Sequence, residues 1–512
     1  MNILTNPDER EDARRRITLI LDARVEWFCA ETREGAGLPL GKGEWELETA
    51  HDALLFSYRT GRGVERVWRV AGWEWTGARL HLRAARRLGA ERAVLELIPR
   101  ASVSEGIEAL AAARRAACAQ LAALVCAATE NAKVERATLS RGARRSESGR
   151  YARIILRVGR EQIAVTGAVV ALGAHEADAF LASAMLWWMR LGEKSKRLHA
   201  PALWLVVAHE LKDATAERLT LLREDVRRAI KLYETDEGWQ NLSPVALPEL
   251  EETFNRAARF RHPPRAELTE TAARIVALAP EAIDAVRARH GETLRFHGLA
   301  FARVRNWMRR ERVWFGAGRA PRVLLEEDNW PQLAKLIDEL REHRRAGSID
   351  HRHAFYASAP EAWLESLLRR DITRLDPGLR LAPLYAQFRT ARDGKSTGAR
   401  PVDLLALRRD GRLVVIELKV AEDAALPLQG ADYWRRISTY HRAGHIERAR
   451  LFGDAEIADE SPLVYLVAPM LRFHHSFSLL ARAVTPRIEM YRFDLNEGWR
   501  AGVRVMRRTR VS

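Results

Sequence analysis

Three side chains on two predicted strands have the types and spacing to hold a divalent cation. Asp403 lies in the apolar run Val402–Leu407, and Glu417 and Lys419 lie in the run Leu413–Val420. Two carboxylates that face each other on adjacent strands repel, because their β-carbons are only about 5 Å apart. A hard cation such as Mg²⁺ or Mn²⁺ removes that repulsion, polarises a phosphate oxygen and lowers the pKa of a bound water. The pattern therefore predicts a hydrolytic metal site.

Lys419 is informative because lysine is rare in this chain. Nine lysines stand among 84 basic residues, so arginine supplies nearly all of the positive charge. An arginine is effectively never deprotonated, whereas a lysine can exchange a proton with water or substrate. Two residues beyond Glu417 and on the same face, Lys419 could orient an attacking water or neutralise charge on the reacting phosphate.

The turn between the two strands decides whether the carboxylates meet. A three-residue loop, Arg409–Gly411, places glycine at the left-handed position that such hairpins require. Arg408 then pairs with Arg412, and Asp403 lies directly opposite Glu417. A two-residue loop would shift the register by one and turn Asp403 to the other face. We predict the three-residue loop.

A regular series of elements surrounds these strands. A proline begins a helix whose first turn is acidic, as the helix dipole favours, and alternating or continuous apolar runs mark the strands. The expected elements are a helix at Glu361–Arg370, a strand at Arg380–Arg389, the two strands above, a helix at Gln429–Gly444, a strand at Leu463–Ala468 and late strands at Ile488–Phe493 and Val503–Met506.

Asp403 and Glu417-Leu418-Lys419, each on a hydrophobic strand, resemble the motif pair of the PD-(D/E)XK nuclease superfamily. Pro401 precedes the aspartate by two positions instead of one, and Gln429 with Tyr433 resembles the Gln-x-x-x-Tyr element of the RecB-like branch. The resemblance covers about 359–511. It implies a C-terminal restriction-endonuclease-like αβββαβ core within an α+β or α/β multidomain chain.

The resemblance also implies roles for individual residues. Mg²⁺, or Mn²⁺, would be bound by Asp403, Glu417 and an acidic residue of the preceding helix, either Glu361 or Glu365. We prefer Glu365, because its leucine neighbours mark the buried side of that helix. Lys419 would assist the water, and Gln429 would orient a phosphate or support the site. An ordinary glutamine at the start of a helix explains Gln429 nearly as well.

Charge suggests where nucleic acid would bind. The net charge is +16, and half of the surplus lies in residues 351–512. Arg369, Arg370 and Arg400 could contact phosphates, a sequence-independent interaction that salt weakens, and Tyr433 is a further candidate contact. A solvated arginine-rich surface explains the three arginines about equally well. A His474–His475 pair before a short helix is expected to be structural.

The upstream residues are less informative. We expect a β-rich region at 1–100 that opens with a helix at Ile17–Glu31, an α+β region at 101–240, a mainly helical connecting region at 241–350 and the nuclease-like domain at 351–512. Strand and helix order in 101–240 is similar to that of the C-terminal domain without its acidic residues, so a degenerate nuclease-like domain is one reading and an unrelated fold the other. We expect the four tryptophans of the first region to be packing residues rather than base-stacking ones: Trp45, Trp68, Trp73 and Trp75.

The overall expectation is a cytoplasmic, metal-dependent endo- or exonuclease acting in DNA repair or defence against foreign DNA. Three observations favour this location. The three cysteines lack zinc spacing, and the N-terminus has no secretory signal. No apolar run reaches the roughly 18 residues that span a bilayer, so we expect no membrane partner. The expected partner is nucleic acid, DNA before RNA, and a homodimer stays open. The alternatives are an RNA-directed nuclease and a catalytically silent module that binds nucleic acid or protein.

Overall fold

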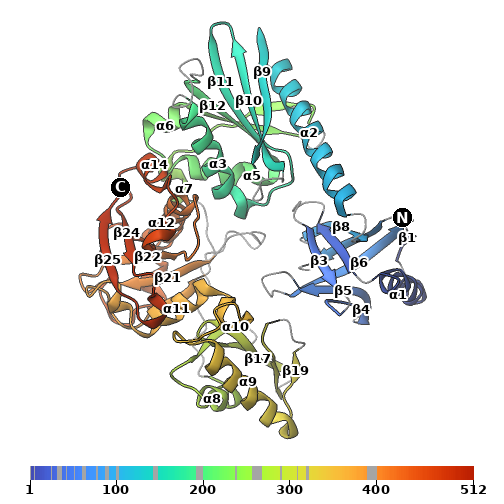
Figure 1. The fold of residues 1–512 in the computed structure, drawn as a ribbon. Helices are drawn as coiled ribbons and strands as arrows, with labels where there is room; N and C mark the ends of the chain where they lie inside the picture. Colours follow the sequence, from blue (N-terminus) through green and yellow to red (C-terminus); the bar gives the residue numbers. More distant parts are fainter. Residues whose placement is uncertain are drawn as a thin grey trace. The chain divides into compact units, whose positions relative to one another are not determined.

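The computed structural model shows a mixed α/β chain with four sheets, divided into two compact units (Figure 1). Unit 1 comprises residues 1–219 and 225–247, and unit 2 comprises residues 220–224 and 248–512. The structure describes residues 2–511 except 5, 25, 32–36, 42, 51, 60–64, 77–78, 87–90, 100–102, 142–147, 192–199, 237–238, 256–267, 289–290, 308–309, 319–321 and 389–400.

Unit 1 opens with a helix packed on an antiparallel sheet of order β3-β2-β8-β7-β6-β5-β4, with β1 paired to β6. The expected helix at Ile17–Glu31 is wrong in its second half, because α1 ends at Asp22, residues 23–24 form a turn and a strand begins at Glu26. The elements are β1 (Asn2–Ile3), α1 (Pro7–Asp22), β2 (Glu26–Glu31), β3 (Gly37–Gly41), β4 (Trp45–Ala50), β5 (Ala53–Arg59), β6 (Glu65–Trp75), β7 (Leu80–Arg86) and β8 (Glu91–Pro99).

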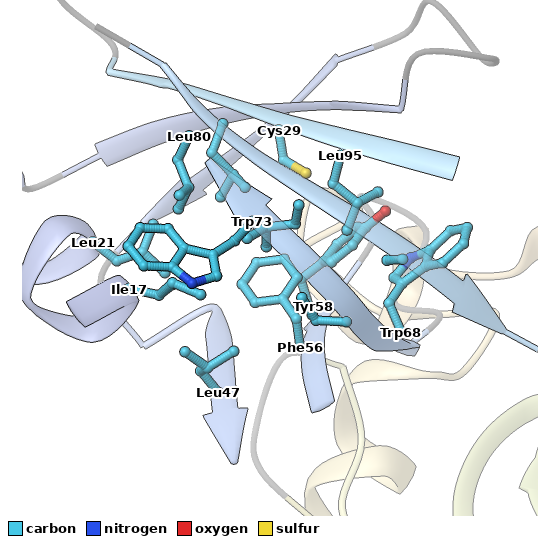
Figure 2. Close-up of a cluster of buried hydrophobic side chains, with 14 of the residues drawn as sticks. Ile17, Leu21, Cys29, Leu47, Phe56, Tyr58, Trp68, Trp73, Leu80 and Leu95 are labelled. Carbon is cyan, nitrogen blue, oxygen red and sulfur yellow. The ribbon is translucent and has the colours of Figure 1, made fainter. Parts of the chain in front are cut away.

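The tryptophans of this sheet are packing residues, as expected. Trp68 is fully buried and Trp73 is nearly so, and both belong to the hydrophobic core between α1 and the sheet (Figure 2). Trp45 and Trp75 pack against the same core from partly buried positions. Their rings therefore stabilise the sheet, and the described residues of this region leave no tryptophan pair free to stack on bases.

The second sheet of unit 1 has the order β14-β13-β12-β11-β10-β9. Its pairings run antiparallel between β9, β10 and β11, parallel from β11 to β13, and antiparallel at β14. The elements are α2 (Val103–Ala127), β9 (Ala132–Arg141), β10 (Ser148–Val158), β11 (Glu161–Ala168), α3 (Ala177–Met189), β12 (Ala202–Ala208), α5 (His209–Leu219), α6 (Glu224–Arg228), β13 (Ile230–Thr235) and β14 (Leu242–Pro244).

Helix α2 is the one described helix that is long and apolar enough to cross a membrane, over Leu110–Ala127, although no such run was expected from the sequence. Its residues Cys118, Leu121 and Val125 are buried in a core shared with β10 and β11. Gly167 on β11 allows this close approach, since a β-carbon there would lie 2.5 Å from a Leu121 methyl carbon. One face of α2 therefore packs on its sheet, while 28% of the Leu110–Ala127 window is buried.

Unit 2 contains a five-stranded antiparallel meander of order β15-β16-β17-β18-β19, where a mainly helical region was expected. That expectation is wrong. In β16, burial alternates residue by residue, the period of a half-buried strand rather than of a helix. The elements are α7 (Leu250–Phe254), α8 (Glu270–Val276), β15 (Ile283–Ala288), β16 (Gly291–Phe296), β17 (Leu299–Trp307), β18 (Arg310–Phe315), β19 (Val323–Leu324) and α9 (Trp330–His343).

The last sheet has the order β20-β21-β22-β23-β24-β25 (Figure 1). The C-terminal strands and helices expected from the sequence are present, although β20 begins only at Tyr385, where a strand from Arg380 was expected. Helix α11 covers one face, and α12 covers the other. The elements are α10 (Ala354–Ala357), α11 (Pro360–Arg370), β20 (Tyr385–Phe388), β21 (Val402–Leu407), β22 (Leu413–Leu418), α12 (Leu426–Arg442), α13 (His445–Arg448), β23 (Leu463–Pro469), α14 (Phe477–Ala483), β24 (Met490–Leu495) and β25 (Val505–Arg510).

Candidate metal and catalytic site

The predicted hairpin register is confirmed. The β21–β22 ladder runs from Leu407↔Leu413 to Leu404↔Ile416. The turn is the three-residue loop Arg409–Gly411, closed by the Arg408 amide donating to the Arg412 carbonyl, with Gly411 at φ +85°. Continuing this register by one position places Asp403 opposite Glu417.

The backbone ladder between β21 and β22 ends before Asp403, and the Asp403 side chain then connects the two strands. One of its carboxylate oxygens, Oδ2, accepts a hydrogen bond from the Leu418 amide at 2.9 Å. On the other edge of β22, the Lys419 amide donates to the Val467 carbonyl at 2.9 Å. Both strands are therefore held in place at the point where the carboxylates meet.

Glu417 is the buried centre of the cluster. It is 2% exposed, and its Oε1 accepts a hydrogen bond from Lys419 Nζ at 2.5 Å. Burial, followed by the neighbouring Asp403 carboxylate, raises the pKa of Glu417 well above its ordinary value. Burial alone would lower the pKa of Lys419, but the carboxylates of Glu417 and Asp403 raise it overall, so the lysine stays protonated and positively charged.

The helix carboxylate whose charge is coupled to this cluster is Glu361, whereas Glu365 was preferred from the sequence. Partial desolvation raises the pKa of Glu361, and the charge of Lys419 opposes that shift while the charges of Asp403 and Asp423 add to it. Glu361 keeps an exposed surface at the start of α11, as a group at the mouth of a site does.

Glu365, one turn along α11, is 4% exposed and forms an ion pair with Arg295 of β16 at 3.8 Å. Its buried position was the reason for preferring it. The buried side of α11, however, also faces the meander of unit 2, so burial alone does not distinguish the roles of the two glutamates. Asp423 is an acidic neighbour that the motif did not indicate, because it follows β22 in a loop.

The start of α11 is positioned by one buried arginine. Arg344, which follows α9 and is 0% exposed, donates to the carbonyls of Ser358 at 2.7 Å and Ala359 at 3.2 Å. It also donates to the His297 carbonyl at 2.8 Å in the turn between β16 and β17. Burial, with a smaller contribution from Arg500, lowers the pKa of Arg344 to about 9. The turn that presents Glu361 is thus attached to the meander.

The remaining predicted residues lie in different places. Gln429 is 3% exposed in the first turn of α12, and its Oε1 has no hydrogen-bond partner among the described residues. Tyr433 is a core residue between α12 and the sheet, 4% exposed, so its expected nucleic-acid contact is wrong. Its ring packs with core residues of β21 and β22, a burial that aromatic side chains contribute without any ligand.

The two arginines at the end of α11 are not at the site either. The Arg370 guanidinium lies 3.8 Å from Asp284 and hydrogen-bonds the Pro280 carbonyl, and Arg369 also acts on the Asp284 carboxyl. Eight or nine residues along a helix separate them from Glu361 by about 12 Å. Their expected role in phosphate contact is therefore not supported, and Arg400 lies outside the described residues.

A second ligand set was missed at the sequence level. Glu422, His474 and His475 each offer one ligand atom, and these atoms lie within 4.8 Å of one another. Two imidazoles and a carboxylate suit Zn²⁺ better than Mg²⁺. His474 also has the structural role that was expected, because its Nδ1 accepts the Ser476 amide at the start of α14.

No protein-family model matches the chain, and no curated protein or solved structure is detectably similar to it.

Proposed function

We propose that residues 351–512 form a Mg²⁺- or Mn²⁺-dependent nuclease domain of the PD-(D/E)XK type, acting on DNA. The observation that supports this best is the geometry of β21 and β22. Asp403 and Glu417 meet on adjacent strands, with Lys419 bonded to Glu417 and Glu361 close to Lys419. The order helix, three-stranded meander, helix, strand matches the core that the resemblance implies.

The side chains fit a divalent cation. Glu417 Oε2 is buried and has no hydrogen-bond partner among the described residues. An unpartnered buried carboxylate oxygen costs several kcal/mol unless a cation binds it. Among the described residues, the three carboxylates around Lys419 offer oxygen ligands, which is the donor set of Mg²⁺ or Mn²⁺.

Each residue would then have a distinct task. Asp403, Glu417 and Glu361 would hold the cation, which supplies polarisation of the phosphate and acidification of a bound water. Lys419, fixed by Glu417, would orient that water or neutralise charge on the phosphate. Gln429 would support the site from the first turn of α12. Glu361 itself is exposed to solvent.

The decisive experiment compares cleavage of plasmid, single-stranded DNA and RNA with Mg²⁺, Mn²⁺ or EDTA. The wild-type chain should cleave DNA only with metal. Asp403→Ala and Lys419→Ala should each lose at least 100-fold in rate, whereas Asp454→Asn, at an exposed acid paired at 3.9 Å with Arg450, should not change it.

Absence of metal-dependent cleavage of any substrate, or cleavage by the Asp403→Ala and Lys419→Ala variants at the wild-type rate, would refute the enzymatic proposal. Cleavage of RNA alone would retain the site and replace the substrate.

A further inference from the structure

The second sheet of unit 1 and the last sheet of unit 2 have the same order, the same strand directions and the same helix placements. In both, three antiparallel strands are followed by a helix, a parallel strand, a helix, a second parallel strand and a final antiparallel strand. The helix before the first strand, α2 or α11, packs on the corresponding face.

The agreement extends to individual residues. The β11–β12 ladder has five pairs, from Ile163↔Ala202 to Gly167↔Val206, and the β22–β23 ladder has five, from Val414↔Leu463 to Leu418↔Val467. The next ladder has six pairs in each sheet, and both begin one residue after the start of the preceding one, at Leu203 and at Val464.

The strand pairing by itself aligns the two sheets residue by residue. Ile163 corresponds to Val414, so Thr166 occupies the position of Glu417 and Ala168 that of Lys419. Arg153 pairs with Thr166, as Asp403 lies opposite Glu417. The acid, acid and lysine of one domain are thus arginine, threonine and alanine in the other, a set that cannot hold Mg²⁺.

The altered position has features of an anion site. The Thr166 hydroxyl is 1% exposed and has no hydrogen-bond partner among the described residues. Arg153 is half-buried beside the Trp187 ring, its guanidinium carbon 5.9 Å from the ring centroid. Within the described part of the chain, no carboxylate pairs with Arg153. The burial of its guanidinium, and then Arg141, lower its pKa.

The surrounding strands are basic. Arg141 and Arg136 on β9 are exposed, and neither has a carboxylate partner among the described residues. Arg157 is paired with Glu135. This surface therefore attracts anions, and the backbone of a nucleic acid is the polyanion that the proposed function provides.

We propose that residues 103–244 are a second, non-cleaving copy of the C-terminal domain that binds the phosphodiester backbone of nucleic acid through Arg153 and the neighbouring arginines of β9. The copy itself rests on strand pairing alone, and the choice of ligand rests on the proposed function. Arginine is suited to this task, since its planar guanidinium binds two phosphate oxygens at once.

The test measures binding by the full chain to labelled single-stranded DNA, duplex DNA and single-stranded RNA in EDTA, by fluorescence anisotropy at several salt concentrations. Arg153→Gln should weaken binding by at least fivefold and reduce the slope of log K against log salt by about one. Arg153→Lys should retain most of the affinity. Arg160→Gln, in the exposed turn between β10 and β11, controls for loss of one positive charge.

The thermal transition of each variant shows whether it is folded. If Arg153→Gln is unstable, the affinity and salt slope of Arg153→Lys still test the inference. Equal affinity and salt slope for Arg153→Gln and Arg160→Gln would overturn the inference even if the wild-type chain cleaves DNA. Loss of binding in Arg153→Gln, together with no cleavage by the wild-type chain, would support the inference and refute the proposed nuclease.

Discussion

The assignment of Glu361 in place of Glu365 makes a prediction that separates two carboxylates one helical turn apart. In Glu361→Gln, the cation loses one of three carboxylates. The effect on affinity should be at least the 10- to 100-fold that loss of a supporting group causes. At a Mg²⁺ concentration 100 times the wild-type Kd, the cation stabilises the chain by about 2.7 kcal/mol, and a 100-fold weaker site would stabilise it by only about 0.4 kcal/mol.

Without metal the same variant should be no less stable than wild type. Burial raises the pKa of the Glu361 carboxyl, and Asp403 and Asp423 add to the rise against the opposing charge of Lys419. The folded chain therefore favours a neutral group at this position, which the amide supplies. Glu365→Gln should behave in the opposite way. It leaves Arg295, with 22% of its side chain exposed, without its ion-pair partner, which should lower the free energy of unfolding by about 1–3 kcal/mol with or without Mg²⁺.

The assay is urea denaturation of both variants with EDTA and with Mg²⁺, beside cleavage rates at saturating Mg²⁺. Glu361→Gln should lose the metal-dependent part of its stability and at least 100-fold of its cleavage rate, whereas Glu365→Gln should change the rate less than about threefold. If Glu365→Gln abolishes cleavage and Glu361→Gln does not, the reasoning from the pKa of Glu361 is wrong.

Two predictions concern the turn that supports α11. Gly298 has φ +79°, and a β-carbon there would lie 2.0 Å from the Ala362 carbonyl oxygen, so Gly298→Ala should lower the free energy of unfolding by about 2–5 kcal/mol in urea denaturation. The control is Gly453→Ala, at φ +66° with open space around it, which should cost only the backbone strain. An equal loss of stability in both variants would contradict the proposed contact. Burial, and then the charges of Arg370 and Arg344, lower the pKa of His297 from 6.5 to about 4, so between these values the unfolded chain binds a proton that the folded chain excludes. The stability of the wild-type chain relative to His297→Phe should fall by up to about 3 kcal/mol as the pH is lowered from 7 to 4, and a difference that stays constant with pH would show that His297 is not protected from protonation.

The opposition of Asp403 and Glu417 could be predicted from the sequence because the information that fixes it is local. The period of two in strands and the requirement for glycine at a left-handed turn determine the β21–β22 register, and that register brings Asp403 to Glu417. Buried strands of five to seven mostly apolar residues could be predicted for the same reason. A hairpin joins residues only a few positions apart, so local rules suffice to place its side chains.

Contacts between elements were decided only by the tertiary structure. The sequence does not distinguish Glu361 from Glu365. In the structure, Glu365 forms an ion pair with Arg295 of a distant strand, and the charge of Lys419 acts on Glu361. The sequence suggested Arg369 and Arg370 as phosphate contacts, but in the structure both act on Asp284 of the meander. The correspondence of Arg153 with Asp403 needs two parallel ladders, whose partners are separated by whole helices along the chain. Local propensity carries no information about which distant strand an element will meet, because that choice depends on burial summed over the folded domain.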